Sequence, residues 1–107
     1  MRVAVMADIH GNLEAFEAVL ADGEDRGLDA TVSLGDNVGY GPDPEAVLRL
    51  LRRRGIPSVA GNHELGVRNA RLRRWFNPTA RRPVEMTCEA LSPDSRDSVP
   101  YTHLRAH

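Results

Sequence analysis

With 107 residues, the chain can form one domain or part of one, with a modest buried core. Its apolar fraction of 41% and its charged fraction of 27% are ordinary for a soluble globular protein. No apolar run approaches the roughly 20 residues that cross a bilayer, so the sequence predicts no membrane span.

The net charge of −1 conceals opposite charges in the two halves of the chain. Residues 1–48 carry ten acidic residues and two arginines, a sum of −8, whereas residues 49–107 carry twelve arginines and five acidic residues, a sum of +7. The halves could pair with each other, or the basic side could hold an anionic ligand. The single cysteine, Cys88, and an N-terminus unlike a signal peptide lead us to expect a cytoplasmic protein.

A strand and a helix are predicted first. Residues 2–7 are apolar and rich in Val, which is typical of a strand buried on both faces. After a polar loop over residues 8–12, Asn12 can cap a helix that ends near Gly27. Apolar residues recur at helical spacing along it, so one face should pack on the sheet: Leu13, Phe16, Val19 and Leu20.

The same order then repeats. Residues 30–34 form a second strand pattern, and a loop rich in Gly and Pro follows. Pro44 opens a second helix after Asp43, and Gly55 ends it. Residues 58–60 are predicted as a third strand. Strands alternating with helices predict an α/β fold of order β-α-β-α-β with parallel pairing.

The rest of the chain is expected to be mostly helical. Residues 65–76 form a polar helix pattern, and residues 79–91 form another that Pro83 should kink or split. Residues 92–94 break the second helix. The tail from residue 95 has no clear periodicity and is expected to be loose.

Each predicted strand runs into a polar segment that could carry chemistry. The segments are residues 8–12, 35–37 and 61–64. The carboxyl ends of parallel strands lie along one edge of a sheet, so these segments should converge. Each segment alone could be an ordinary turn, but together they favour a metal site built from Asp8, His10, Asp36, Asn62 and His63.

Two divalent cations about 3.5–4 Å apart can clamp the attacking and leaving oxygens of a phosphate ester. Asp36, on the middle strand, is best placed to bridge them, with Asp8 and His10 on one cation and Asn62 on the other. Mixed oxygen and nitrogen ligands suit Mn²⁺, Fe or Zn²⁺ without choosing among them. A metal-activated water would attack phosphorus.

His63 is the candidate catalytic residue of this site. It would stabilise the developing charge or protonate the leaving oxygen, and Glu64 could orient it.

The segments Asp-Ile-His-Gly-Asn, Gly-Asp-Asn-Val-Gly-Tyr-Gly-Pro and Gly-Asn-His-Glu resemble the calcineurin-like metallophosphoesterase family in order, spacing and strand context. The resemblance is closest to small bacterial and archaeal phosphodiesterases and phosphatases. It covers roughly residues 1–95, a partial domain, and leaves residues 96–107 unmatched. It implies half of a four-layer αββα sandwich, and a missing second half would leave apolar surface exposed.

By matching positions, the resemblance assigns Asp8 and His10 to a first metal, Asp36 to the bridge, Asn62 to a second metal and His63 to catalysis. It implies two divalent ions, with Mn²⁺ favoured and Fe, Zn²⁺ or Ni²⁺ as alternatives. It also implies phosphate mono- or diesters as substrates, with nucleic acid only as a substrate.

Two departures from the family pattern stand out. Tyr40 occupies a position where protein Ser/Thr phosphatases and diadenosine tetraphosphatases of the family have Arg, and Tyr40 could border the substrate. The family also supplies further metal-binding histidines, including a Gly-His-x-His motif. Neither His103 nor His107 matches them, so we expect impaired activity from this chain alone.

Two other functions remain open on the sequence. One is a non-catalytic interaction module on the same fold, which metal titration would distinguish from an enzyme. The other is nucleic-acid binding, which would show a steep salt dependence. The basic residues concerned are Arg68, Arg71, Arg73, Arg74, Arg81 and Arg82.

Overall fold

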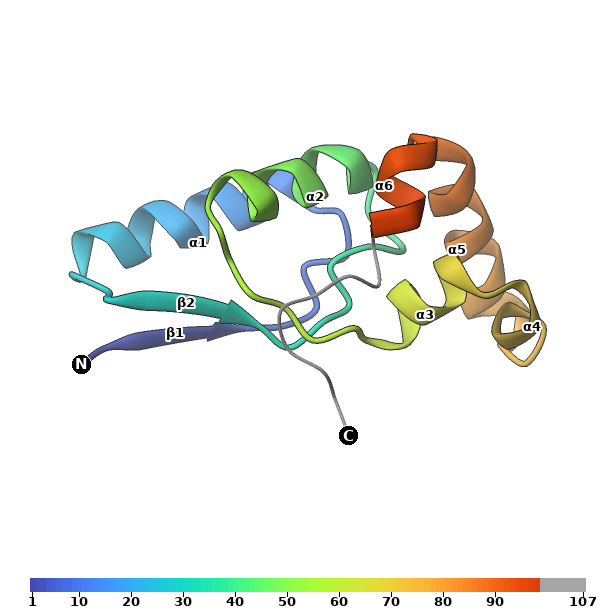
Figure 1. The fold of residues 1–107 in the computed structure, drawn as a ribbon, viewed down its shortest axis with the longest axis horizontal. Helices are drawn as coiled ribbons and strands as arrows, with labels where there is room; N and C mark the ends of the chain where they lie inside the picture. Colours follow the sequence, from blue (N-terminus) through green and yellow to red (C-terminus); the bar gives the residue numbers. More distant parts are fainter. Residues whose placement is uncertain (99–107) are drawn as a thin grey trace.

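The structure, a computed structural model, describes residues 1–98 (Figure 1). Helices α1 and α2 lie side by side on one face of a small sheet, and the later helices gather beyond its end. Within residues 1–98, none of the helices combines the length and hydrophobicity that a membrane span needs. The elements in chain order are β1 (Val3–Met6), α1 (Leu13–Asp25), β2 (Ala30–Ser33), α2 (Pro44–Arg53), α3 (Asn62–Arg68), α4 (Ala70–Arg73), α5 (Pro78–Ala90) and α6 (Pro93–Ser98).

The sheet confirms the α/β class and the parallel pairing. β1 and β2 run parallel, with Val3 opposite Ala30 and Met6 opposite Ser33, and α1 makes the crossover between them. The predicted positions of the first two helices are also confirmed. The Asn12 side chain accepts a hydrogen bond from Ala15 N at the start of α1.

The third predicted strand is reduced to a single bridge, so the expectation for residues 58–60 was wrong in extent. Ser33 pairs with Ser58 through bonds from Ser33 N to Pro57 O and from Val59 N to Ser33 O. The chain then turns at Gly61 into α3, which leaves too few residues for a longer ladder. The bridge nevertheless places this segment beside β2.

The hydrophobic core lies between the sheet and its two covering helices. Phe16 of α1 and Val47 of α2 are fully buried, together with Val38 from the loop between β2 and α2. The apolar residues of α2 are also buried, namely Val47, Leu48, Leu50 and Leu51. On α1 the stripe is narrower than predicted, because Val19 is half exposed at its edge.

The opposite face of the sheet is uncovered in the part of the chain that the structure describes. Val3, Val5 and Leu34 are 44%, 60% and 55% exposed, and Val5 pairs with Val32 on this face. The prediction that residues 2–7 are buried on both faces was therefore wrong. The expected exposed apolar surface is present.

The helices after residue 61 differ from the prediction in their boundaries. The polar helix predicted over residues 65–76 is two helices. α3 begins at Asn62, and α4 follows a break at Asn69, whose side chain accepts from Arg71 N and Leu72 N.

Helix α5 continues through Pro83, so the sequence was wrong to suggest a split there, while a kink at Pro83 stays a prediction. Proline removes one backbone bond, but the Asn77 side chain caps the helix through Ala80 N, and Val84 is fully buried. α5 ends at Ala90, and residues 95–98, expected to be loose, belong to α6. The rest of the predicted tail, with His103 and His107, lies outside the described residues.

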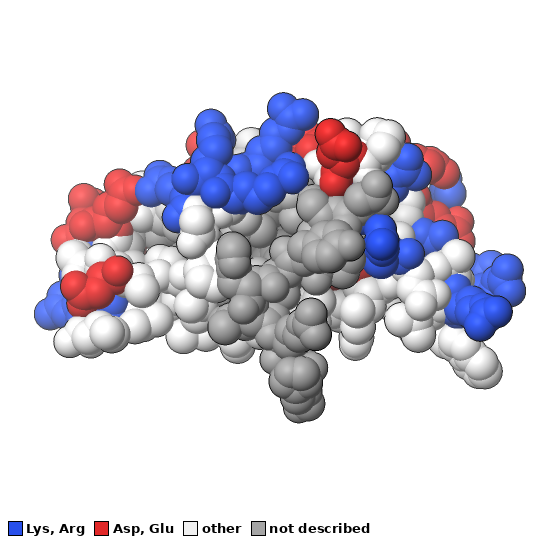
Figure 2. All heavy atoms as spheres, in the orientation of Figure 1, with Lys and Arg blue, Asp and Glu red and all other residues white. Residues whose placement is uncertain are grey.

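Opposite charges meet where the acidic and basic halves of the chain adjoin. Figure 2 shows arginines over α2 beside acidic residues over α1. Arg54 pairs with Glu24, and Arg49 lies 3.2 Å from Glu45. Pairing between the halves thus accounts for part of the charge asymmetry. Two of the arginines considered for nucleic-acid binding, Arg81 and Arg82, pair with Glu85 within α5.

Glu45 also ties α2 to α6. Its carboxylate accepts hydrogen bonds from Ser92 N at 2.7 Å and from the Ser95 hydroxyl. Burial raises the pKa of Glu45, but the hydrogen bonds from Ser95, Ser92 and Arg49 outweigh it and lower the pKa to about 2. The ionised carboxylate therefore stabilises the folded chain.

We predict that Glu45→Gln lowers the free energy of unfolding by roughly 1–3 kcal/mol at pH 7, because the bonds lose their charged acceptor. The folded-state pKa lies below the ordinary value of 4.5. The stabilisation is hence complete above about pH 5 and disappears as the pH falls toward 2. Urea unfolding of the wild type and of Glu45→Gln measures this at pH 7 and pH 2.5. The difference in their free energies of unfolding should be smaller at pH 2.5. A difference independent of pH would contradict this assignment.

Candidate metal centre

Main-chain hydrogen bonds hold the loops after β1 and β2 together beyond the end of the sheet. Asp8 N donates to Gly35 O at 3.2 Å, His10 N to Asp36 O at 2.9 Å and Gly11 N to Asn37 O at 2.8 Å. The two loops therefore stay side by side beyond the last strand residues. Their polar residues face one another although they are far apart in sequence.

The backbone of these loops is unusual at the residues that carry the polar groups. Asp8, His10 and Asp36 have φ values of 57°, 47° and 54°. These values lie in the left-handed region, which residues other than glycine seldom adopt. Such conformations cost free energy and persist only where surrounding bonds hold them. The inter-loop bonds hold them here.

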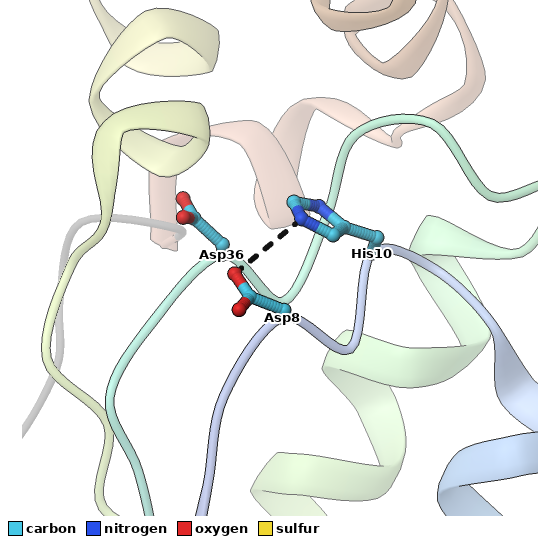
Figure 3. Close-up of side chains that lie close together, drawn as sticks. All are labelled: Asp8, His10 and Asp36. Carbon is cyan, nitrogen blue, oxygen red and sulfur yellow. Dashed lines mark ion pairs between the residues drawn. The ribbon is translucent and has the colours of Figure 1, made fainter.

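Three candidate ligand atoms converge as a result. One atom each from Asp8, His10 and Asp36 lies within 4.8 Å of the other two (Figure 3). His10 Nε2 is 3.5 Å from Asp8 Oδ1. His10 Nδ1 lies 3.0 Å from Val38 O, and because a carbonyl only accepts, Nδ1 carries the proton. The other ring nitrogen, Nε2, faces the two carboxylates.

This donor set suits a divalent cation. Two carboxylates and a neutral imidazole are ligands of Mn²⁺, Fe and Zn²⁺, and a second bond that fixes the imidazole is typical of a metal-binding histidine. Asp8, His10 and Asp36 could therefore hold a metal ion. The prediction that strand ends bring these three residues together is confirmed.

His63 lies beside the three ligands on the first turn of α3. Its backbone N–H donates to Asp36 Oδ1 at 3.0 Å, and its ring centroid is 4.8 Å from that of His10. The ring is buried, and Nδ1 has no hydrogen-bond partner within residues 1–98. Burial lowers the pKa of His63, against the opposing effect of Asp36, and so favours the neutral imidazole.

Asn62 is placed differently from the other predicted ligands. It begins α3 between Gly61 and His63, which both lie against Asp36, but it is exposed. Its role as a ligand stays a prediction.

Tyr40 borders the centre. Its ring centroid lies 5.2 Å from His10 and 5.0 Å from His63, and the side chain is about half exposed. With φ of 65°, its backbone is also left-handed. Tyr40 thus packs over both imidazoles while keeping an open surface.

Glu64 does not orient His63 in the way that the sequence suggested. Its carboxylate accepts the backbone N–H groups of Asp36 at 2.6 Å, Asn37 at 3.1 Å and Gly61 at 3.1 Å. Burial raises the pKa of Glu64, while these bonds counteract the rise. The Gly-Asn-His-Glu segment indicated that Glu64 lies near the site. It did not indicate which groups donate hydrogen bonds to the carboxylate.

Sequence reasoning missed a second buried polar group. Asn37 accepts from Ser33 Oγ at 2.6 Å and donates through Nδ2 to Ser58 Oγ at 2.9 Å. These bonds join β2, the loop after it and the bridging segment. The available signal was a serine in each of two otherwise apolar runs.

Cys88 is remote from this chemistry. It is half-buried, accepts from the Arg73 guanidinium at 2.6 Å, and burial raises the pKa of its thiol. It is a helix residue of α5 that packs against the core.

Comparison with known proteins assigns a family to this geometry. The family model for calcineurin-like phosphoesterase matches residues 1–101. The chain belongs to the calcineurin-like phosphoesterase family. The predicted resemblance is thereby confirmed.

Two curated relatives are longer than this chain. An uncharacterised protein of Methanocaldococcus jannaschii, MJ0912, is 45% identical over 75 residues, which cover 70% of this chain and 31% of that protein. Serine/threonine-protein phosphatase 2 of Escherichia coli is 39% identical over 61 residues, 56% of this chain and 28% of that enzyme. The chain spans about a third of the length of these curated relatives.

A solved metallophosphoesterase structure supports the fold. The crystal structure of a metallophosphoesterase from Sphaerobacter thermophilus superposes with a TM-score of 0.73 at 37% identity, covering 92% of this chain and 39% of that one. This agrees with the expectation that the chain corresponds to part of the family domain.

The packing of His63 predicts a specific role for Gly39. A Cβ atom on Gly39 would lie 2.1 Å from His63 Nδ1, and Gly39 has φ of 89°. Gly55 has φ of 61° with nothing within 4 Å of such an atom. We predict that Gly55→Ala costs about 1–2 kcal/mol of unfolding free energy from backbone strain alone.

Gly39→Ala should cost roughly 1–3 kcal/mol more than Gly55→Ala, because the buried His63 ring must move. Chemical denaturation of both variants, with the NMR signals of the His63 ring, checks this. Equal costs and an unshifted His63 signal would contradict the packing.

Proposed function

We propose that this chain supplies part of a dinuclear metal centre that hydrolyses phosphate mono- or diesters. The observation that carries the proposal is the convergence of Asp8, His10 and Asp36 within 4.8 Å, in a member of the calcineurin-like phosphoesterase family. Asp8 and His10 would hold one cation, Asp36 would bridge, and Asn62 would serve a second.

The residues of the chain would divide the chemical work. When bound, the cations would supply Lewis-acid activation of a water and neutralise phosphate charge. His63, beside Asp36, would place its imidazole against the developing charge or the leaving oxygen. The half-exposed face of Tyr40 would border the organic part of the substrate.

Several finer points belong to the same proposal. Mn²⁺ is our first choice of metal, with Fe, Zn²⁺ or Ni²⁺ as alternatives, because the donor set suits all of them. We also propose the cytoplasm as the location, since a single cysteine fits a reducing compartment. Full activity would need the further histidine ligands that the family resemblance places outside the matched motifs.

Mn²⁺ titration of the 107-residue chain, followed by EPR of the free ion, tests the proposal. We predict that Asp36→Asn weakens Mn²⁺ binding at least tenfold, whereas Asp22→Asn, a substitution of a surface carboxylate that pairs with Arg26, leaves it unchanged. His63→Ala should keep the affinity. If a chromogenic phosphodiester is hydrolysed, His63→Ala should slow turnover by about 10²–10⁴-fold.

Equal Mn²⁺ affinity in the wild type and Asp36→Asn would contradict the centre. A wild-type chain that binds no divalent metal would favour the non-catalytic interaction module instead.

A further inference from the structure

We infer that Glu64 is a positioning residue of the metal centre, whose buried carboxylate fixes the backbone of Asp36 and thereby the place of the bridging ligand. The inference rests on the proposed function, because it assigns Glu64 a role toward the metal that Asp36 would hold. It replaces the expected role of Glu64 toward His63.

The contacts of Glu64 link two parts of the centre through three main-chain N–H groups. Oε1 accepts from Asp36 N at 2.6 Å and from Gly61 N at 3.1 Å, and Oε2 accepts from Asn37 N at 3.1 Å. The side chain is fully buried. One carboxylate therefore joins the loop after β2 to the start of α3, using main-chain donors on both sides.

Asp36 needs such a constraint because its backbone is left-handed, with φ of 54°. A carboxylate residue in this region relaxes to a commoner conformation unless its surroundings hold it. Relaxation would rotate the side chain away from Asp8 and His10. The bond from Asp36 N to Glu64 is the shortest of those that Glu64 makes to this loop.

The first turn of α3 holds Asp36 from two directions. Glu64 holds its main chain, and His63 N holds its carboxylate through Oδ1 at 3.0 Å. Gly61 closes the space beside it, since a Cβ atom there would lie 2.4 Å from Asp36 Oδ1. Three contacts from residues 61–64 thus set the position of the Asp36 carboxylate.

Glutamine cannot accept all of the hydrogen bonds that this carboxylate accepts. Gln offers one acceptor oxygen, and its NH₂ group would face a main-chain N–H, donor against donor. Glu64→Gln therefore keeps the size of the side chain but frees the Asp36 loop on one side. In metal sites, loss of such a supporting group typically weakens metal affinity by about 10–100-fold.

The control is Glu45→Gln, which makes the same chemical change at a carboxylate that also accepts a backbone N–H and ties two elements, α2 and α6. Both variants should lose stability. Mn²⁺ binding to the 107-residue chain, measured by EPR of the free ion, separates them. We expect a Kd about 10–100-fold higher for Glu64→Gln and within twofold of the wild type for Glu45→Gln.

Two further readouts address position directly. The NMR signals of the Asp36 and Asn37 amide protons should move upfield in Glu64→Gln, because these amides lose a charged acceptor. The same signals should keep their positions in Glu45→Gln. Glu64→Asp keeps the charge on a shorter side chain, so it should restore part of the Mn²⁺ affinity relative to Glu64→Gln.

The outcomes are distinguishable. If the wild type binds no Mn²⁺, the proposed function fails and this inference fails with it. If the wild type binds and Glu64→Gln binds equally well, or Glu45→Gln weakens binding as much, Glu64 is only structural and the inference is overturned. If Glu64→Gln does not fold, the Mn²⁺ affinity of Glu64→Asp decides. An affinity equal to that of the wild type overturns the inference. A weaker affinity, with the affinity of Glu45→Gln unchanged, supports it.

Discussion

A row of main-chain hydrogen bonds between the loops after β1 and β2 is the constraint on which the candidate centre depends. Bonds from Asp8, His10 and Gly11 to the loop after β2 keep two distant segments side by side past the last strand residues. Asp8, His10 and Asp36 bear left-handed backbones at this junction, and these bonds hold them. Without them, the two carboxylates and the imidazole would have no reason to converge.

Around these loops, buried polar side chains form hydrogen bonds with main-chain donors and with short side chains. Glu64 collects N–H groups from both sides of the centre, and Asn37 joins two serines from neighbouring segments. Buried polar groups are costly when unpaired, so such a network specifies one arrangement of loops. His63 Nδ1 is the exception within residues 1–98, and it belongs to the residue proposed for catalysis. The centre therefore combines a rigid support with one imidazole nitrogen left unbonded beside the ligands.

The sequence predicted the convergence of the candidate ligands because strand, polar loop and helix recur in a fixed order, and parallel strands end on one edge. It could not predict how the loops achieve it. Positive φ at Asp8, His10 and Asp36 depends on bonds between distant segments, and the partners of Glu64 are main-chain groups that no side-chain pattern reveals. The third strand was overestimated because the turn at Gly61 follows Ser58 so closely. The break expected at Pro83 did not occur, since capping by Asn77 and burial of Val84 outweigh one lost bond.

Family membership and geometry bear on different questions. The calcineurin-like phosphoesterase match establishes ancestry and fold, while hydrolysis by this chain, its metal and its substrate are proposals about the centre. The most direct test of the centre is a crystal structure of the chain with Mn²⁺, with the metal located by its anomalous scattering. We predict an anomalous peak in contact with the side chains of Asp8, His10 and Asp36. Crystals whose anomalous density lies elsewhere, with Asp8, His10 and Asp36 free of metal, would contradict the account.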